Sequence, residues 1–122
     1  MASKRRRLSR SGEFNRVYRD GSSHATRYLV LYTFPRGDEE SGDVRLGVSV
    51  SRKVGGSVDR NKVKRALRES FWGLTEQLPH GFDFVVVARA ELAELVEREG
   101  TGGVTKSLEE ALAAASSGKR ST

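Results

Sequence analysis

The chain has 122 residues and a mass of 13.5 kDa, enough for one domain, and 22 Lys and Arg against 16 Asp and Glu give a net charge of +6. It has no Cys, which excludes a disulfide framework and a thiolate zinc site and suits a reducing compartment. No apolar run approaches the roughly 20 residues of a membrane helix, and the basic start leads into no hydrophobic signal core. Composition therefore predicts a small cytoplasmic domain with no membrane partner.

Positive charge is concentrated in two blocks. Residues 1–27 hold eight basic and two acidic side chains, and residues 52–68 hold seven and one, so each block has a net charge of +6. The remainder of the chain is net acidic. Two such blocks are typical of a protein that binds a polyanion, because neutralising phosphates releases counterions. The alternative interpretation is a solvated surface with a basic tail.

In the first half of the chain, helix and strand patterns follow one another closely. Residues 1–10 are predicted to be a disordered basic tail, because their charges repel and show no apolar period. A short helix is expected over 11–21, and strands over 28–34 and 44–50. The apolar positions that define their faces are Phe14, Val17 and Tyr18 in the helix, Tyr28, Val30, Tyr32 and Phe34 in the first strand, and Val44, Leu46, Val48 and Val50 in the second.

A longer helix is predicted next. Either Ser57 or Asp59 can cap its start, and its apolar period runs to about Leu74. Residues 82–88 follow as the most apolar strand, which we expect to be central in the sheet.

The last third of the chain is predicted to be helical. One helix covers about 90–99 and ends at Gly100, and a second covers about 104–115. Residues 116–122 are expected to be a flexible tail. The order of elements predicts a single α+β domain over 11–115.

The helix that begins near Ser57 has two faces of opposite character. At 100° per residue, its apolar residues fall on one side and its basic residues on the other. Solvated helices usually mix the signs of their charges, whereas here the basic residues all precede Glu69. Arg60 also places positive charge in the first turn, where the helix dipole disfavours it. The expected core face is Val63, Ala66, Leu67, Ser70, Phe71 and Leu74, and the opposite face holds Asn61, Arg65, Arg68 and Trp72, with Lys64 at its border.

A resemblance to a known family is carried by residues 45–69, which read RLGVSVSRKVGGSVDRNKVKRALRE. They resemble the signature of the bacterial ribonuclease P protein component. In that family a strand reading Gly-x-Ser-Val-Ser-Lys/Arg-Lys-x-Gly leads into a helix reading Arg-Asn-Arg-x-Lys-Arg-x-x-Arg. Lys62 stands where Arg is usual, and Tyr18 stands where Phe is common. The flanking matches are Phe14, Val17, Tyr18 and Gly21, the strand segment 29–32 and the strand segment 83–89.

The resemblance implies a fold and a division of labour. The fold would be a two-layer α/β sandwich like the second domain of ribosomal protein S5, with a left-handed βαβ crossover. The function would be that of the protein subunit of ribonuclease P, the endoribonuclease holoenzyme that removes the 5′ leader of precursor tRNA. Its partners would be the catalytic RNA and precursor tRNA, and not DNA. The RNA would carry the hydrolysis with Mg²⁺, so that the protein alone binds no metal or cofactor.

The resemblance also assigns residues to two surfaces. The set implied to bind the catalytic RNA is Arg52, Lys53, Arg60, Asn61, Lys62, Lys64, Arg65 and Arg68. The set implied to bind the leader is Phe14, Tyr18, Val30, Tyr32 and Ser49. On their own, the rings at positions 14 and 18 fit a packed core as well as a stacking platform. Trp72 likewise fits either RNA stacking or a cover over neighbouring apolar residues.

The sequence offers no catalytic constellation. His24 and His80 are isolated, and Asp38, Glu39 and Glu40 read as a polar surface loop. A protein-only nuclease would need paired carboxylates for metals or a His acid and base, and neither pattern is present. The alternatives to the ribonuclease P subunit are therefore a ribosomal or other structured-RNA-binding protein of S5-like fold and, less well supported, an autonomous endonuclease.

Overall fold

One mixed β-sheet organises the molecule. The computed structural model describes residues 5–8, 11–35, 44–74, 78 and 81–116. The strands pair in the order β1-β4-β5-β3-β2, with β1, β4 and β5 mutually parallel and β3 and β2 antiparallel to their neighbours. β5 is central, as its apolar sequence predicted. The elements are β1 (Arg5–Arg7), α1 (Ser11–Asp20), β2 (Ser22–Ala25), β3 (Leu29–Pro35), β4 (Val44–Ser49), α2 (Ser57–Gly73), β5 (Phe82–Ala88) and α3 (Leu92–Ser116).

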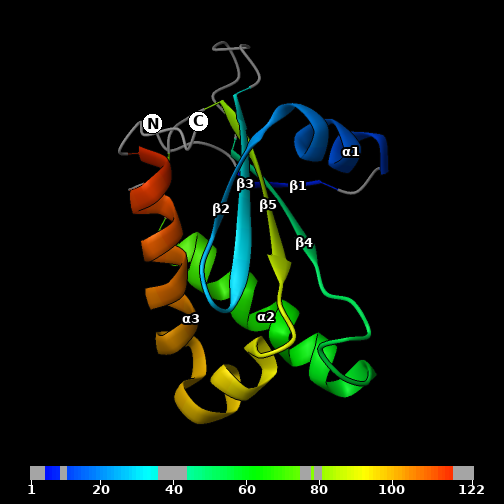
Figure 1. Ribbon diagram of the computed structural model, residues 1–122, viewed down its shortest axis with the longest axis vertical. Coiled ribbons are helices and arrows are strands. Elements are labelled where there is room, and N and C mark those ends of the chain that lie inside the picture. Colours follow the sequence, from blue (N-terminus) through cyan, green and yellow to red (C-terminus); the bar gives the residue numbers. More distant parts are fainter. Residues whose placement is uncertain (1–4, 9–10, 36–43, 75–77, 79–80, 117–122) are drawn as a thin grey trace.

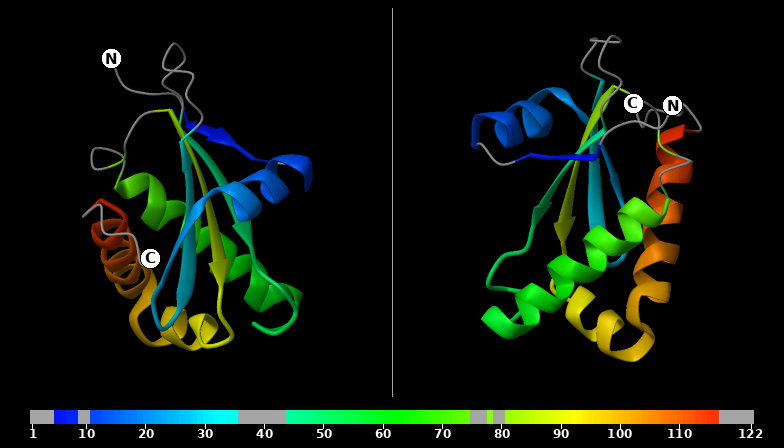
Figure 2. Two further views of the ribbon diagram at one scale, coloured as in Figure 1. Left: turned by 45° about the horizontal axis from the view of Figure 1, so that its top comes forward. Right: turned by 180° about the vertical axis from the view of Figure 1, so that it is seen from behind.

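The helices cover the two faces of the sheet unequally. Figures 1 and 2 show α2 and α3 packed against one face and α1 lying across one end of the other face. The larger core lies under α2 and α3, where Leu31 and Phe84 of the sheet meet Leu67 and Leu108 of the helices. A smaller core under α1 contains Val17. The rest of the second face is therefore left without a helix over it.

The connection from β4 to β5 passes through α2. These two strands are hydrogen-bonded neighbours and run in the same direction. In Figure 1 both point down, β4 lies to the right of β5, and α2 crosses behind the sheet. The crossover thus carries α2 along the back of the sheet.

The amphipathic period of α2 is confirmed. Its buried residues are Val63, Ala66, Leu67, Ser70 and Phe71. The expected cap differs, since the N-cap residue is Gly56 and no side chain of the described residues caps the helix. α3 is broken at Gly100, whose φ of 65° and ψ of −154° are not helical, which confirms the predicted division into two helices.

Residues 5–8 differ from the disordered tail predicted over 1–10. Arg5–Arg7 pairs with β4, the Leu8 N–H donates to the Leu46 carbonyl at 3.0 Å, and the Leu8 side chain is buried. The domain therefore begins before residue 11. Pairing to a sheet edge uses backbone groups, so a strand can form there without an apolar alternation. The rest of that tail, residues 117–122, the loop at 38–40 and His80 lie outside the described residues.

Candidate nucleic-acid interface

Side chains on the face of the sheet that carries α1 form three rows. The register of β3, β5 and β4 sets these rows, because paired residues point to the same side. α1 lies over the first two rows, and the third row is half-buried on the open part of the face. In order from α1 outward the rows are Phe34–Asp83–Arg45, Tyr32–Val85–Gly47 and Val30–Val87–Ser49.

Three rings form an aromatic platform at the edge of α1, which we define as Phe14, Tyr18 and Tyr32. The ring centroids of Phe14 and Tyr18 are 6.3 Å apart, and Tyr18 meets Tyr32 edge-on at 4.9 Å. Tyr18 is 37% exposed, while Phe14 and Tyr32 are half-buried. Val17, between them in sequence, is the fully buried residue of α1. The helix thus packs through Val17 and leaves a ring available to solvent.

Gly47 sets how closely Phe14 approaches the sheet. A Cβ atom placed at Gly47 would lie 2.5 Å from Cζ of the Phe14 ring, closer than real Cβ contacts allow. Any larger residue would therefore move that ring away from β4. The glycine of the family motif has a packing reason at this position.

An ion-pair cluster lies beneath α1, in the first row. Arg45 donates from Nε and Nη2 to the two carboxylate oxygens of Asp83, each at 2.7 Å, and from Nη1 to Glu13 of α1 at 2.9 Å. Arg16 of α1 reaches the same Asp83 at 3.3 Å. The hydrogen bond to Asp83, followed by the nearby negative charges, raises the pKa of Arg45 above its ordinary value. The cluster fixes α1 on β4 and β5 and so positions the platform.

None of the predicted RNA-facing residues of α2 is among the buried residues of that helix. Asn61, Lys62 and Arg65 are exposed, and Arg60, Lys64 and Arg68 are half-buried. Nε of Arg60 is buried and, in the part of the chain that the structure describes, has no hydrogen-bond partner.

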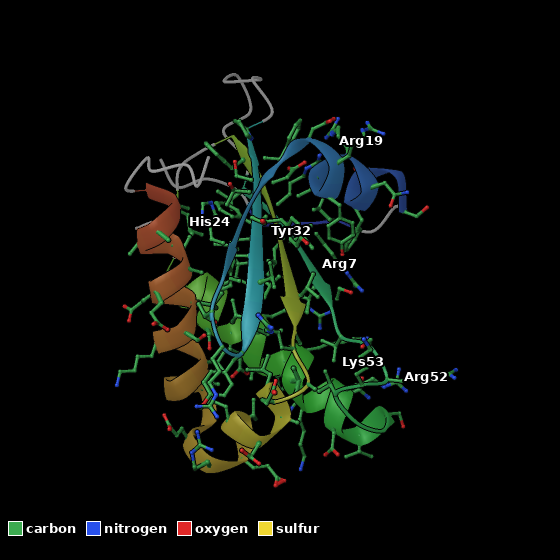
Figure 3. The ribbon with its side chains drawn as sticks, in the orientation of Figure 1. Arg7, Arg19, His24, Tyr32, Arg52 and Lys53 are labelled. Atoms are coloured by element: carbon green, nitrogen blue, oxygen red, sulfur yellow. The ribbon has the colours of Figure 1, made fainter. Side chains whose placement is uncertain are left out.

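Two further basic residues extend this surface. Arg52 and Lys53 are exposed on the turn between β4 and α2, and Figure 3 shows them at the end of the sheet far from α1. Tyr32 lies between that turn and α1 in the same view. The structure thus brings the basic residues together on α2 and its preceding turn, and the five predicted leader residues together on the opposite face of the sheet.

Some residues of these surfaces were not predicted. Val87 completes the third row between Val30 and Ser49, and Arg7 of β1 lies beside Lys64 and Arg68 at the sheet edge. Period-2 alternation with Asp83 could have placed Val87, whereas nothing in the run of arginines marked Arg7. Trp72 packs edge-on against Phe71 at 5.0 Å, which supports its covering role.

Metal-binding and membrane-spanning features were also sought in the described ranges. There, no three His, Cys, Asp or Glu residues gather closely enough to hold a metal ion. Within the same ranges, no helix is both long enough and apolar enough to cross a membrane.

The sequence is similar to known proteins of one family. A sequence model of the Ribonuclease P family matches residues 2–114. The ribonuclease P protein component of Bacillus cereus is 38% identical over 96 residues, covering 79% of this chain and 82% of the relative. That of Caldanaerobacter subterraneus is 46% identical over 94 residues, covering 77% and 78%.

Solved structures agree with the sequence relatives. The RNase P protein of Staphylococcus aureus superimposes with a TM-score of 0.78 at 37% identity, covering 92% of this chain and 96% of that one. The RNase P protein from Thermotoga maritima gives a TM-score of 0.76 at 35% identity, covering 87% and 94%.

Fold and surfaces together define an α+β protein with one basic helix and one aromatic sheet face, a class suited to RNA. The chain belongs to the bacterial ribonuclease P protein component family. It is the protein subunit of RNase P, the endoribonuclease holoenzyme that processes the 5′ end of precursor tRNA. Family membership decides against a ribosomal protein.

Proposed function

We propose that this subunit binds its two RNA partners on separate surfaces. The basic surface of α2 and its preceding turn binds the catalytic RNA of RNase P. The aromatic platform and the third row of the sheet bind the single-stranded 5′ leader of precursor tRNA. The catalytic RNA carries the hydrolysis with Mg²⁺, and the assembly works in the cytoplasm.

The observation that carries this proposal is the exposed ring of Tyr18 held edge-on against Tyr32 at 4.9 Å. A single strand is bound without sequence preference when bases stack on rings, each worth about 1–3 kcal/mol. The half-buried Val30 and Val87 beside the rings extend this surface with low polarity. Such a surface suits unpaired bases better than a duplex.

The charge of α2 supports the other half of the proposal. Arg65 and Lys62 are exposed on the side of the helix away from the core, and the only acid of its first turn is Asp59. Cations held along a rigid helix match the phosphates of a folded RNA.

We also infer the finer topology implied by the resemblance, an S5-like two-layer sandwich with a left-handed βαβ crossover. The support is the arrangement in Figure 1, where α2 lies behind the sheet and β4 lies to the right of β5 with both strands pointing down. Parallel crossovers are right-handed in nearly all proteins, so this unit departs from the rule.

Reconstitution with the cognate catalytic RNA tests the two-surface proposal. Arg65→Ala is expected to weaken assembly with the catalytic RNA while leaving the preference for precursor over mature tRNA intact in the assembled fraction. Tyr18→Ala is expected to assemble normally and to lose part of that preference. If both variants impair assembly and neither changes the preference, the two surfaces do not have separate partners.

A further inference from the structure

The central part of the surface proposed for the leader has no net charge. We define this neutral surface as α1 together with the three rows of the sheet. α1 holds two arginines against Glu13 and Asp20, and the three rows hold Arg45 against Asp83, so both charge sums are zero. The net charge of +6 in residues 1–27 therefore lies outside this helix.

Each cation of the neutral surface is paired with a carboxylate. Arg45 makes the bidentate pair with Asp83, whose side chain has no exposure, and Arg16 reaches the same carboxylate at 3.3 Å. Because breaking a buried pair of this kind is costly, Arg45 is not available to a phosphate. Arg19 donates to Asp20 from Nε and Nη2, each at 3.3 Å. This pair is exposed and weak, but when it opens it leaves one charge of each sign.

Cations without a carboxylate partner, within the ranges that the structure describes, lie at the edges of the neutral surface. Arg7 and Lys64 line a cavity at the β1–β4 edge, next to the Phe14 ring. Arg89 is exposed two residues beyond Val87, at the end of the third row. Phosphates crossing the neutral surface therefore meet free cations at its borders rather than at its centre.

The centre of the neutral surface offers contacts for bases instead. Tyr18 is exposed and lies edge-on to Tyr32 at 4.9 Å, and the half-buried Val30 and Val87 adjoin these rings. A base gains from stacking on a ring whatever the charge nearby. A phosphate gains by releasing counterions to free cations, and a surface of zero net charge supplies no such gain.

We propose that the leader segment crossing the neutral surface is recognised through its bases while its phosphates there stay in solvent, an inference that rests on the leader binding proposed above. Phosphate contacts are confined to the edges of the surface. The preferred substrates are therefore precursors whose leader bases are unpaired and free to stack at these nucleotides, with no requirement for backbone charge.

Abasic leaders identify the nucleotides that lie on the platform. Abasic nucleotides are placed one at a time along the leader, and the affinity of the holoenzyme for each precursor is measured with wild type and with Tyr18→Ala. A platform nucleotide is one whose base matters to wild type but no longer matters to Tyr18→Ala, because the two changes remove the same contact. If no nucleotide behaves in this way, the leader does not bind the platform, and the leader half of the proposed function fails together with this inference.

Uncharged methylphosphonate linkages then replace the phosphates of those same nucleotides. We expect the affinity to change by less than about twofold and the slope of log affinity against log salt to stay the same, because no phosphate contact is lost. If the phosphates were bound there, the slope would fall by about 0.7 for each linkage replaced. Such a fall at nucleotides that the abasic leaders place on the platform would overturn base recognition and leave leader binding intact.

Arg19→Gln is the matched variant on the protein side. It removes an exposed cation from the residue next to Tyr18 and leaves the ring in place. We expect less than about a twofold change in affinity for the precursor, against the larger loss from Tyr18→Ala. If Arg19→Gln is as damaging as Tyr18→Ala, and the damage disappears with methylphosphonate leaders, Arg19 binds a leader phosphate and the inference is wrong.

Discussion

Arg45 and Asp83 form a bidentate ion pair across neighbouring strands, with two N–O distances of 2.7 Å and no exposure of the Asp83 side chain. The pair lies under α1 and is extended by Glu13 and Arg16 of that helix. It therefore links the two parallel strands at the centre of the sheet to the helix that carries the platform. Removing one partner would leave the other charge buried.

Replacing Arg45 is expected to be severely destabilising. Arg45→Met removes both 2.7 Å hydrogen bonds from Arg45 to the buried Asp83 carboxylate, and breaking buried pairs of this kind costs about 3–5 kcal/mol. Thermal unfolding should show a fall in Tm of about 10 °C or more. Arg16→Met is the matched control, because its side chain is 42% exposed and its loss should cost less than about 1 kcal/mol. If the two variants lose equal stability, Arg45 is not the main partner of Asp83.

The pH dependence of this pair has a definite sign. Because the folded pKa of Arg45 is raised, the stability it contributes is fully present below its unfolded pKa and is lost only as pH rises through the folded pKa. The difference in unfolding free energy between wild type and Arg45→Met should therefore not decline between neutral and mildly alkaline pH. Chemical denaturation of both proteins at several pH values in that range measures this difference. If the difference falls as the pH rises, the Arg45–Asp83 pair is not what produces it.

Gly47→Ala should disturb the platform through Phe14. The added methyl would lie 2.5 Å from the ring, and overpacking of this kind costs about 1–3 kcal/mol. Precursor affinity of the holoenzyme should fall along with stability. In a double-mutant cycle, Phe14→Leu should recover part of the loss, because the two residues share one contact. If the effects of the two substitutions simply add, Gly47 does not act through the Phe14 ring.

Gly100 tests the break in α3. Its φ of 65° disfavours a side chain, so Gly100→Ala should lower the free energy of unfolding by about 1–2 kcal/mol. Gly102→Ala is the control: a Cβ there meets nothing within 4 Å and φ is not positive, so a small gain is expected. Denaturant unfolding measures both. A stabilised Gly100→Ala variant would contradict the break.

Salt dependence tests the basic surface of α2. Arg65→Ala should weaken assembly with the catalytic RNA and reduce the slope of log affinity against log salt by about one, the loss of one phosphate contact. Lys106→Ala, exposed on α3, removes an equal charge and should leave the slope unchanged. Identical slopes for the two variants would mean that only the net charge matters.

The features that could be predicted from the sequence depend on the spacing of apolar residues within a single helix or strand. The buried side of α2 follows from Val63, Leu67 and Phe71 at helical spacing, and these are fully or nearly fully buried. The alternation of β4 likewise placed Val44 and Leu46 in the core. Each of these patterns lies within one element, so no knowledge of partners was required.

The features that sequence missed depend on pairing between distant segments. Arg45 and Asp83 are 38 residues apart, and neither residue marks the other in the sequence. β1 joins the sheet through backbone hydrogen bonds, so its arginines gave no strand signal. Val87 lies in a strand that is apolar on both faces, which hides the side facing the platform. The two surfaces could be proposed from motif resemblance, but the place of Arg7 beside Lys64 and Arg68 required the register of β1.

The affinity of the holoenzyme for precursor tRNA as a function of leader length tests the platform most directly. Wild type and Tyr18→Ala are compared with leaders shortened stepwise to none, and Tyr18→Phe, which keeps the ring, serves as control. We predict that Tyr18→Ala loses about tenfold in affinity with a full leader, consistent with one lost stacked base, and that the loss disappears with mature tRNA. A loss of the same size for mature tRNA and for every leader length would contradict leader binding at this platform.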